Sequence, residues 1–252
     1  MTVEVGLLGP VQLTVAGRLV PVSSRKQRAL IAALAVRPSE AVAIETIAEA
    51  LWGEHPPPTA RNTIEAYVSR LRRLLAEAGA PTDVLATEPP GYRLRGIDTD
   101  LERFEQLRAD GLPREALALW RGPALGDLDA ESSLERERAA LEELRLETRL
   151  DLVDLELAAG RAASVTHELE SMIREHPFQE RPRRQLMLAL YRAGRQADAL
   201  ALYRDTRRLF SDELGLEPSP DLQRLEQAIL RHDPALTLPA APVPAARSRR
   251  RR

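Results

Sequence analysis

The sequence has no cysteine, and aromatic residues make up only 4% of it. The missing cysteines exclude disulfides, thiolate metal sites and a cysteine nucleophile, and they fit a cytoplasmic protein. Because aromatic side chains are scarce, leucine, alanine, valine and isoleucine must form the core. No apolar run approaches the roughly 20 residues that span a bilayer. The first residues, MTVEVGLLGPVQL, lack the features of a signal peptide, so neither a leader nor a membrane segment is expected.

Motifs for catalysis are also missing. The four histidines do not have the spacing of a metal site: His55, His167, His176 and His232. There is no glycine-rich phosphate loop, nucleophile elbow or kinase motif. Glu and Arg recur at i,i+3 and i,i+4 spacings in residues 131–149, which predicts surface ion pairs on a long helix. We therefore expect no enzymatic activity, no metal and no cofactor.

The charges that are present are unevenly distributed. With 252 residues, 44% of them apolar and 29% charged, the chain is typical of a soluble globular protein of two domains. Residues 1–96 hold 11 basic and 9 acidic side chains, whereas residues 97–246 hold 20 and 29. Because an acidic surface is repelled by nucleic acid, any contact with DNA is expected from the N-terminal part.

The first 96 residues have the pattern of a small α+β domain. Short apolar runs separated by Gly-Pro and Ala-Gly-Arg predict an antiparallel meander over residues 3–22. A helix should follow Ser23 or Ser24 and end at Pro38. After a short extended piece, residues 44–52 predict a second helix, and a third should begin after Thr59 as its cap. A hairpin closed by Pro89-Pro90-Gly91 completes the order of elements.

The third helix is the most informative segment. On a 3.6-residue period its apolar residues form one stripe: Ile64, Val68, Leu71 and Leu75. The opposite face is polar or small, with two further residues at its flank: Asn62, Ala66, Ser69 and Arg73, with Thr63 and Arg70. A major groove about 12 Å wide admits such a helix. An Arg-rich face is also common on solvated surface helices, but a basic hairpin after it favours a winged helix-turn-helix.

The second part of the chain predicts helix after helix, with a period of 34 residues. Seven positions recur at this interval: Leu152, Leu155, Leu157, Gly160, Arg161, Ala163 and Leu169 match Leu186, Ala189, Tyr191, Gly194, Arg195, Ala197 and Tyr203. This is the period of a tetratricopeptide repeat. The small alanines near the start of each second helix are expected to let paired helices approach closely, and stacked pairs to leave a concave surface for a partner. Plain antiparallel packing without a groove is the alternative.

Four segments of the N-terminal part, Ala50–Gly53, Ala60–Ile64, Tyr67–Arg73 and Gly91–Leu94, resemble an OmpR-type winged helix. The run Ala199–Leu230, above all Glu213–Pro218, resembles the bacterial transcriptional activation domain. Both parts in this order resemble the Streptomyces antibiotic regulatory protein (SARP) family of transcriptional activators. The fold expected is an α+β winged helix-turn-helix in residues 1–96, followed by an all-α tetratricopeptide-like domain in 97–234. Residues 235–252, rich in Pro, Ala and Arg, should be a disordered tail.

The resemblance implies a sequence-specific activator of a biosynthetic gene cluster. Such proteins sit side by side, as dimers, on direct repeats in promoter DNA and contact RNA polymerase through its sigma subunit, in the cytoplasm at the nucleoid. By position, the residues implied to face bases are Asn62, Thr63, Ala66, Tyr67 and Arg70. Those implied to hold phosphates are Arg61, Ser69, Arg72, Arg73, Thr87, Arg93 and Arg95, with Trp52 either at the backbone or in the core.

One departure from the family pattern lies in the wing. The segment Thr87–Tyr92 is short and carries an acid, Glu88, where relatives often have an arginine aimed at the minor groove. Reading of the minor groove by the wing tip is therefore not expected, and Arg93 and Arg95 should contact phosphate only. Two alternatives stay open at this point: a repressor with the same DNA-binding domain, and a helical-repeat scaffold for protein partners.

Overall fold

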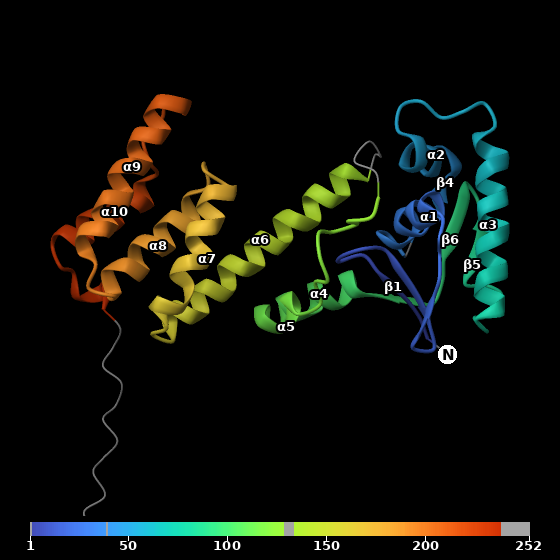
Figure 1. Cartoon of the computed structure of the whole chain (residues 1–252), viewed down its shortest axis with the longest axis horizontal. Coiled ribbons are helices and arrows are strands. Elements are labelled where there is room, and N and C mark those ends of the chain that lie inside the picture. The colour runs from blue at the N-terminus through green and yellow to red at the C-terminus, as the bar shows by residue number, and fades with distance from the viewer. Residues whose placement is uncertain (1, 39, 129–133, 238–252) are drawn as a thin grey trace, which may run out of the picture. The chain divides into compact units, whose positions relative to one another are not determined.

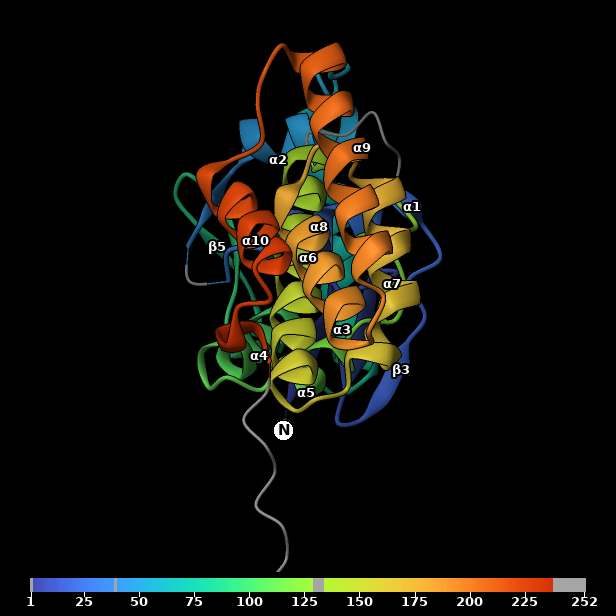
Figure 2. The ribbon, with the colours of Figure 1, turned by 90° about the vertical axis from the view of Figure 1, so that its left-hand side faces the viewer.

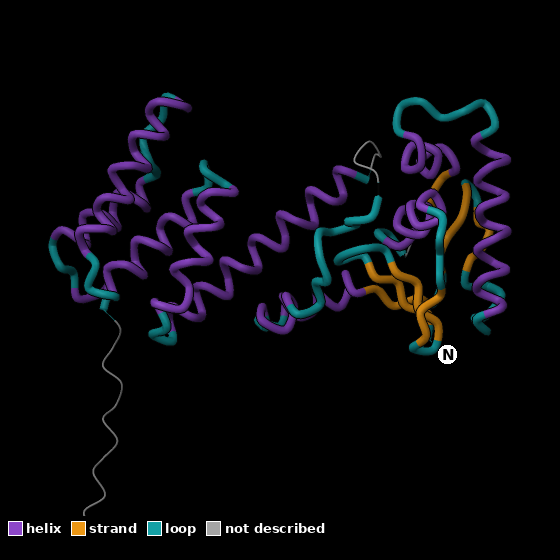
Figure 3. The backbone as a smooth tube through the Cα atoms, viewed as in Figure 1, coloured by secondary structure: helices purple, strands orange, loops and turns teal. Residues whose placement is uncertain are grey.

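The computed structural model of the chain describes residues 2–38, 40–128 and 134–237, and it divides into two compact units (Figure 1). The first unit comprises Met1–Arg149 and the second Leu150–Arg252. Strands occur only in the first of them, as far as the described residues go (Figure 3). The predicted order, an α+β winged helix followed by a helical domain, is confirmed. Residues 238–252, most of the predicted tail, lie outside the described residues.

The chain begins with the predicted meander. Strands β1 (Val3–Gly6), β2 (Gln12–Val15) and β3 (Arg18–Val20) pair in antiparallel order. Alternate residues of β1 and β2 are buried, as a half-covered sheet requires: Val3, Val5, Leu13 and Val15. A fourth strand, β7 (Ile97–Thr99), pairs with β1 in parallel and was not predicted. Its three residues are too short to show an alternating pattern.

Three helices and a second sheet form the winged helix. Helix α1 (Arg25–Ala35) is capped by Ser24, whose hydroxyl accepts from the Gln27 N–H. Helices α2 (Ile44–Trp52) and α3 (Ala60–Glu77) follow, and α3 lies along the hairpin of β5 (Leu85–Glu88) and β6 (Gly91–Leu94) (Figure 1). Strand β4 (Val42–Ala43) pairs with β6. Thr59 precedes α3 as predicted, but its side chain makes no capping hydrogen bond, so the predicted side-chain cap does not form. Instead, the Thr63 hydroxyl donates to the Thr59 carbonyl.

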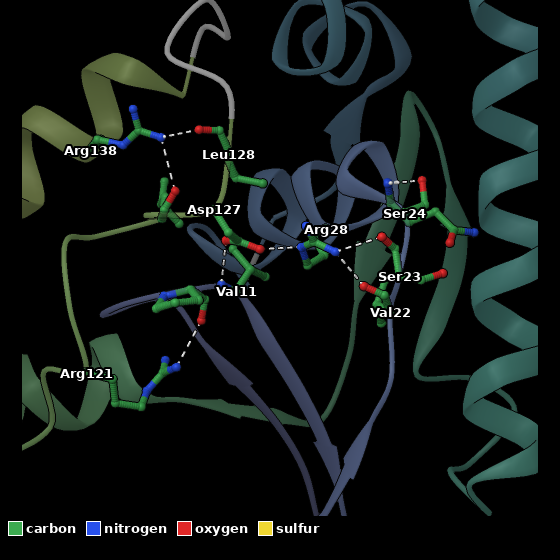
Figure 4. Close-up of polar contacts among 12 residues, drawn as sticks. Val11, Val22, Ser23, Ser24, Arg28, Arg121, Asp127, Leu128 and Arg138 are labelled. Atoms are coloured by element: carbon green, nitrogen blue, oxygen red, sulfur yellow. Dashed lines mark hydrogen bonds and ion pairs between the residues drawn. The ribbon is translucent and has the colours of Figure 1, made fainter.

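The segment after β7 is held to the β1–β2 loop by acidic side chains. Helix α4 (Asp100–Ala109) begins with Asp100, whose carboxylate accepts from the Leu7 and Leu8 N–H groups at 2.6 and 3.1 Å. Beyond the short helix α5 (Pro113–Leu117), Asp127 accepts from the Val11 N–H at 2.8 Å and pairs with Arg28 of α1 (Figure 4). These bonds join residues that are 92 to 116 positions apart.

This clamp ties the segment after β7 to the first unit. Arg121 adds to it by donating to the Pro10 carbonyl at 2.9 Å (Figure 4). It also donates to Asp100 at 2.9 Å. Helix α6 (Glu135–Ala158) then carries the chain from the first unit into the second, with the boundary between Arg149 and Leu150. Residues 97–149 therefore pack with the winged helix, although the sequence patterns change at residue 96.

The second unit repeats one helix–turn–helix arrangement. The end of α6 and α7 (Ala162–Glu175) form the first copy, and α8 (Glu180–Arg192) and α9 (Gln196–Leu214) the second (Figure 2). In both, a glycine with φ near 79° or 76° ends the first helix. The Arg161 N–H donates to the Glu156 carbonyl at 2.9 Å, and the Arg195 N–H donates to the Leu190 carbonyl at 2.9 Å. The 34-residue recurrence is thus a recurrence of structure.

The small alanines near the start of each second helix divide into buried and exposed positions. Ala162 and Ala199 are buried, as the close approach of paired helices requires, whereas Ala163 and Ala197 are exposed. Leu155 is 50% exposed and its counterpart Ala189 is buried, so this position of the repeat is packed only in the second copy. Helix α10 (Pro220–Leu230) and the short 3-10 helix η1 (Pro234–Leu236) complete the unit.

Gly91 gives a test of how the wing is attached. A Cβ atom at this position would lie 2.1 Å from the Val42 carbonyl oxygen, which is backbone and cannot rotate away. We predict that Gly91→Ala separates β4 from β6 and lowers the free energy of unfolding by about 1–3 kcal/mol. Gly122→Ala is the control, since its Cβ would meet only Pro10 Cδ at 3.7 Å. Urea unfolding curves that coincide for the two variants would contradict this account.

Candidate DNA-binding surface

The polar side of α3 faces solvent along the helix. The four residues of the predicted stripe are buried, each at 5% exposure or less: Ile64, Val68, Leu71 and Leu75. The opposite positions are exposed, namely Asn62, Ala66, Ser69, Arg70 and Arg73. Thr63 and Tyr67 are half-buried at the flank, and Tyr67 packs against the core. The helix therefore offers a continuous polar face with a small residue, Ala66, at its centre.

Two arginines on this face are uncommitted. Neither Arg70 nor Arg73 makes a side-chain hydrogen bond or ion pair within the described residues. Asn62 and Ser69 likewise have no side-chain partner within that part of the chain. A ligand can bind these groups without first breaking an internal contact.

Arg72, in contrast, braces the helix against the wing. Its Nε donates to the Leu85 carbonyl at 2.9 Å and its Nη2 to the Thr87 hydroxyl at 2.7 Å. The guanidinium also lies 5.9 Å from the centre of the Tyr92 ring, within cation–π range. The implied phosphate contacts of Arg72 and Thr87 stay a prediction, and the structure adds a positioning role for both.

The wing arginines share one acid. Arg95 Nε donates to Glu88 Oε1 at 2.6 Å, and Arg93 Nη1 lies 3.8 Å from Glu88 Oε2. Arg93 Nε also donates to the Pro38 carbonyl at 3.4 Å. The Glu88 side chain is 24% exposed, so this pairing is only partly screened by water. The acid was visible in the sequence, but its contact with both arginines depends on the pairing of β5 with β6.

The remaining implied contacts lie on α2 and at the start of α3. Arg61 and Glu45 face each other at 3.6 Å with both side chains mostly exposed, which makes the pair weak. Trp52 is half-buried against the core, and the Lys26 ammonium lies 5.9 Å from the centre of its ring. Lys26 also donates to the Leu51 carbonyl at the end of α2. This capping role of the single lysine had no signal in the sequence.

Other kinds of site find no support in the described residues. No group of three or more His, Asp and Glu side chains is arranged there to hold a metal ion. None of the described helices combines the length and the apolar character needed to cross a bilayer. The candidate site is therefore the polar side of α3, whose exposed side chains Asn62, Ser69, Arg70 and Arg73 have no internal partner in the described residues.

Comparisons with known proteins match both parts of the chain. Residues 21–94 match the family model described as the C-terminal domain of transcriptional regulatory proteins, and residues 99–230 match the bacterial transcriptional activator domain. A solved structure of Mycobacterium tuberculosis EmbR in complex with a low-affinity phosphopeptide aligns with a TM-score of 0.82 at 39% identity. The alignment covers 92% of this chain and 66% of that one.

Curated relatives give the same result. EmbR of Mycobacterium tuberculosis is 40% identical over 248 residues, and AfsR of Streptomyces coelicolor is 41% identical over 248 residues. The chain spans only 64% of EmbR and 24% of AfsR. DnrI of Streptomyces peucetius is 35% identical over 267 residues, covering 97% of this chain and 98% of DnrI. The chain therefore belongs to the SARP family of transcriptional regulators, in which an OmpR-type winged helix precedes a bacterial transcriptional activator domain.

Proposed function

We propose that the protein binds promoter DNA through the polar side of α3 and activates transcription of a biosynthetic gene cluster from direct repeats, in the cytoplasm at the nucleoid. The observation that carries this proposal is the exposed α3 face with its two uncommitted arginines, Arg70 and Arg73, beside a braced basic wing. Membership in a family of transcriptional regulators supports it.

The α3 face supplies two kinds of contact. Base edges are read in the major groove by side chains near the centre of the face, here Asn62, Ala66 and Arg70. Contacts to phosphate fix the register of the helix but carry no sequence information, and we assign these to Ser69 and Arg73 with the wing. Because Arg72 holds the wing to α3, helix and wing approach the duplex as one rigid surface.

A single winged helix binds weakly. With about 4–6 phosphate contacts, its affinity falls steeply as salt rises. Two protomers on adjacent repeats add their contacts, and both recognition helices reach the same side of the duplex when the repeats are about 10–11 bp apart. This arrangement explains why one DNA-binding domain in each chain is sufficient for a regulator.

Activation requires a surface that faces the polymerase. Glu54, His55 and Pro56 are exposed in the loop between α2 and α3, and we propose that this loop contacts RNA polymerase holoenzyme at its sigma subunit. The described residues of the helical unit, 150–237, hold 12 basic and 15 acidic side chains, so we propose this unit as the second surface for protein partners.

A footprint on the DNA around the gene is the direct test. We predict protection of repeated elements at a spacing of about one helical turn, next to a promoter element. Protection upstream of that element, with increased transcription in vitro by the holoenzyme, is expected for an activator. Protection across the transcription start with reduced transcription would assign repression instead, and the absence of salt-dependent duplex binding would overturn the proposal.

The division of roles on α3 gives a second test. We predict that Arg70→Ala lowers the ratio of specific to scrambled-duplex affinity by about tenfold or more, since a base contact provides about 1–3 kcal/mol of discrimination. Arg73→Ala should weaken binding to both duplexes alike and reduce the salt slope by about 1. Each arginine is exposed, so the two variants should fold equally well. Equal losses of specificity in gel-shift titrations would refute the assignment.

Glu88 gives a third test, because phosphate must compete with it for the wing arginines. Glu88→Gln removes the internal anion, so we predict tighter binding to nonspecific DNA and a salt slope steeper by about 1–2. Glu49→Gln makes the same charge change on the exposed side of α2 and serves as the control. The two variants would show equal salt slopes if Glu88 acted only through the net charge of the protein.

A further inference from the structure

A pocket of about 590 Å³ lies in the first unit, where strands β1, β2 and β7 meet the start of α4. Small-molecule sites in proteins have volumes of about 300–1,000 Å³. Strand residues on the sheet face that points away from the core line the pocket, among them Glu4, Gln12 and Asp98, together with Leu119 and Arg121. None of the lining residues belongs to α3 or to the wing, so the pocket is separate from the candidate DNA-binding surface.

The lining combines an apolar side chain with neutral hydrogen-bonding groups. Leu119 is only partly buried, so its side chain is available to the apolar body of a ligand. Gln12 and Thr14 of β2 are also partly buried, and neither side chain has a partner among the described residues. An apolar wall with a few polar groups is the usual composition of a ligand site.

Half of the charged side chains in the pocket are engaged in internal contacts. The Asp100 carboxylate accepts from two backbone N–H groups of the β1–β2 loop and from Arg121 Nη2, the last at 2.9 Å. Glu102 Oε2 accepts from the Thr99 hydroxyl at 3.2 Å. Asp100, Glu102 and Arg121 therefore serve to hold the wall of the pocket in place.

The other charged side chains are accessible to a ligand. Glu4 and Asp98 are exposed, and neither has a partner in the described part of the chain. They are register partners on the parallel strands β1 and β7, so their side chains are neighbours on one face of the sheet. Like charges in this position repel each other, and a cation bound between them relieves the repulsion. Arg103 is exposed and likewise lacks a described partner.

The charge of the lining selects a cation. The lining has four carboxylates and two guanidinium groups, a sum of −2: Glu4, Asp98, Asp100 and Glu102 against Arg103 and Arg121. Both the net charge and the accessible acceptors therefore disfavour an anion. Among the described residues, no three His, Asp or Glu side chains are arranged to hold a metal ion, and a metal ion would leave the apolar wall unused. The cation expected is organic.

We propose that this pocket binds a small organic cation, namely a primary amine on an apolar body. The ammonium group lies between Glu4 and Asp98 and donates a charge-assisted hydrogen bond to each carboxylate. The apolar body packs on Leu119. Because the site shares no residue with the α3 face, it stands whether or not the proposed function holds.

Trp120 provides the readout, because it lies between two lining residues, Leu119 and Arg121. The chain has two tryptophans, so Trp52→Phe in the full chain leaves Trp120 as the only one. The probes are hexylamine, cyclohexylmethylamine and phenethylamine, each compared with the alcohol and the carboxylate that have the same apolar body. We expect a saturable change in Trp120 emission with an amine, and binding weaker by about tenfold or more for its two counterparts.

Two double variants make the same charge change in different places. Glu4→Gln with Asp98→Asn should weaken amine binding by about tenfold or more. Glu105→Gln with Asp110→Asn is the control, because both acids are exposed and lie outside the pocket. Arg103→Gln should have the opposite effect and tighten amine binding, since it removes the uncommitted positive charge from the lining.

All the substituted charges are exposed, so the variants should fold like the parent chain, which urea unfolding curves check. The proposal is overturned if no amine changes Trp120 emission, or if the alcohols or carboxylates bind as tightly as the amines. It is also overturned if the pocket double variant binds amines as well as the parent chain does. Equal weakening by the two double variants would overturn it too, because net charge alone would then account for binding.

Discussion

The rotation of α3 about its own axis is the constraint on which the proposed DNA contact depends. Burial of Ile64, Val68, Leu71 and Leu75 fixes that rotation, and burying each such side chain contributes about 1.5–3 kcal/mol. Since the helix is rigid, the same burial determines that Asn62, Ala66 and Arg73 face solvent. Turning α3 to expose other residues would bring apolar side chains into water and carry Arg72 away from the Leu85 carbonyl. The proposed recognition surface is thus specified by buried residues that are not part of it.

The arginines of the first unit differ in what they are free to do. Arg28 and Arg121 join distant segments through Asp127 and Asp100, and Arg72 holds the wing, so these three serve the fold. Arg93 and Arg95 are partly committed to Glu88. Arg70 and Arg73 have no competing contact in the described residues. A basic sequence alone therefore overstates the charge available to DNA, because every internal pair must be broken before phosphate can replace it.

Local sequence patterns predicted much of this structure. Polar contacts between residues far apart in the chain could not be predicted from them. The stripe of α3 and the Gly-Arg turns 34 residues apart follow from helical periodicity and from the conformational freedom of glycine, which the sequence displays directly. Strand β7 and the clamp of Asp100 and Asp127 could not be predicted, because their partners lie about 100 residues away and an isolated Asp looks like any surface residue. For the same reason the change of pattern at residue 96 did not reveal that residues 97–149 pack with the winged helix. At the candidate site, the exposed face was predicted, whereas the internal partners of Arg72 and Glu88 required the strand register.

The arginines of the helical unit are used differently from Arg70 and Arg73, and this supports a division of labour. In the helical unit most arginines with a described contact are paired with acids on the surface, as in Arg181 with Asp151 and Asp154, or Arg207 with Glu217. The hydrogen bond from Arg207 holds the pKa of Glu217 below its usual value, so this pair is fully ionised at neutral pH. Such pairs leave residues 150–237 with 12 basic and 15 acidic side chains, so this described part of the helical unit has no excess of cations for phosphate. Because the α3 face proposed to bind DNA lies in the first unit, the two tasks would use different residues, and recognition of DNA and recruitment of other proteins need not compete.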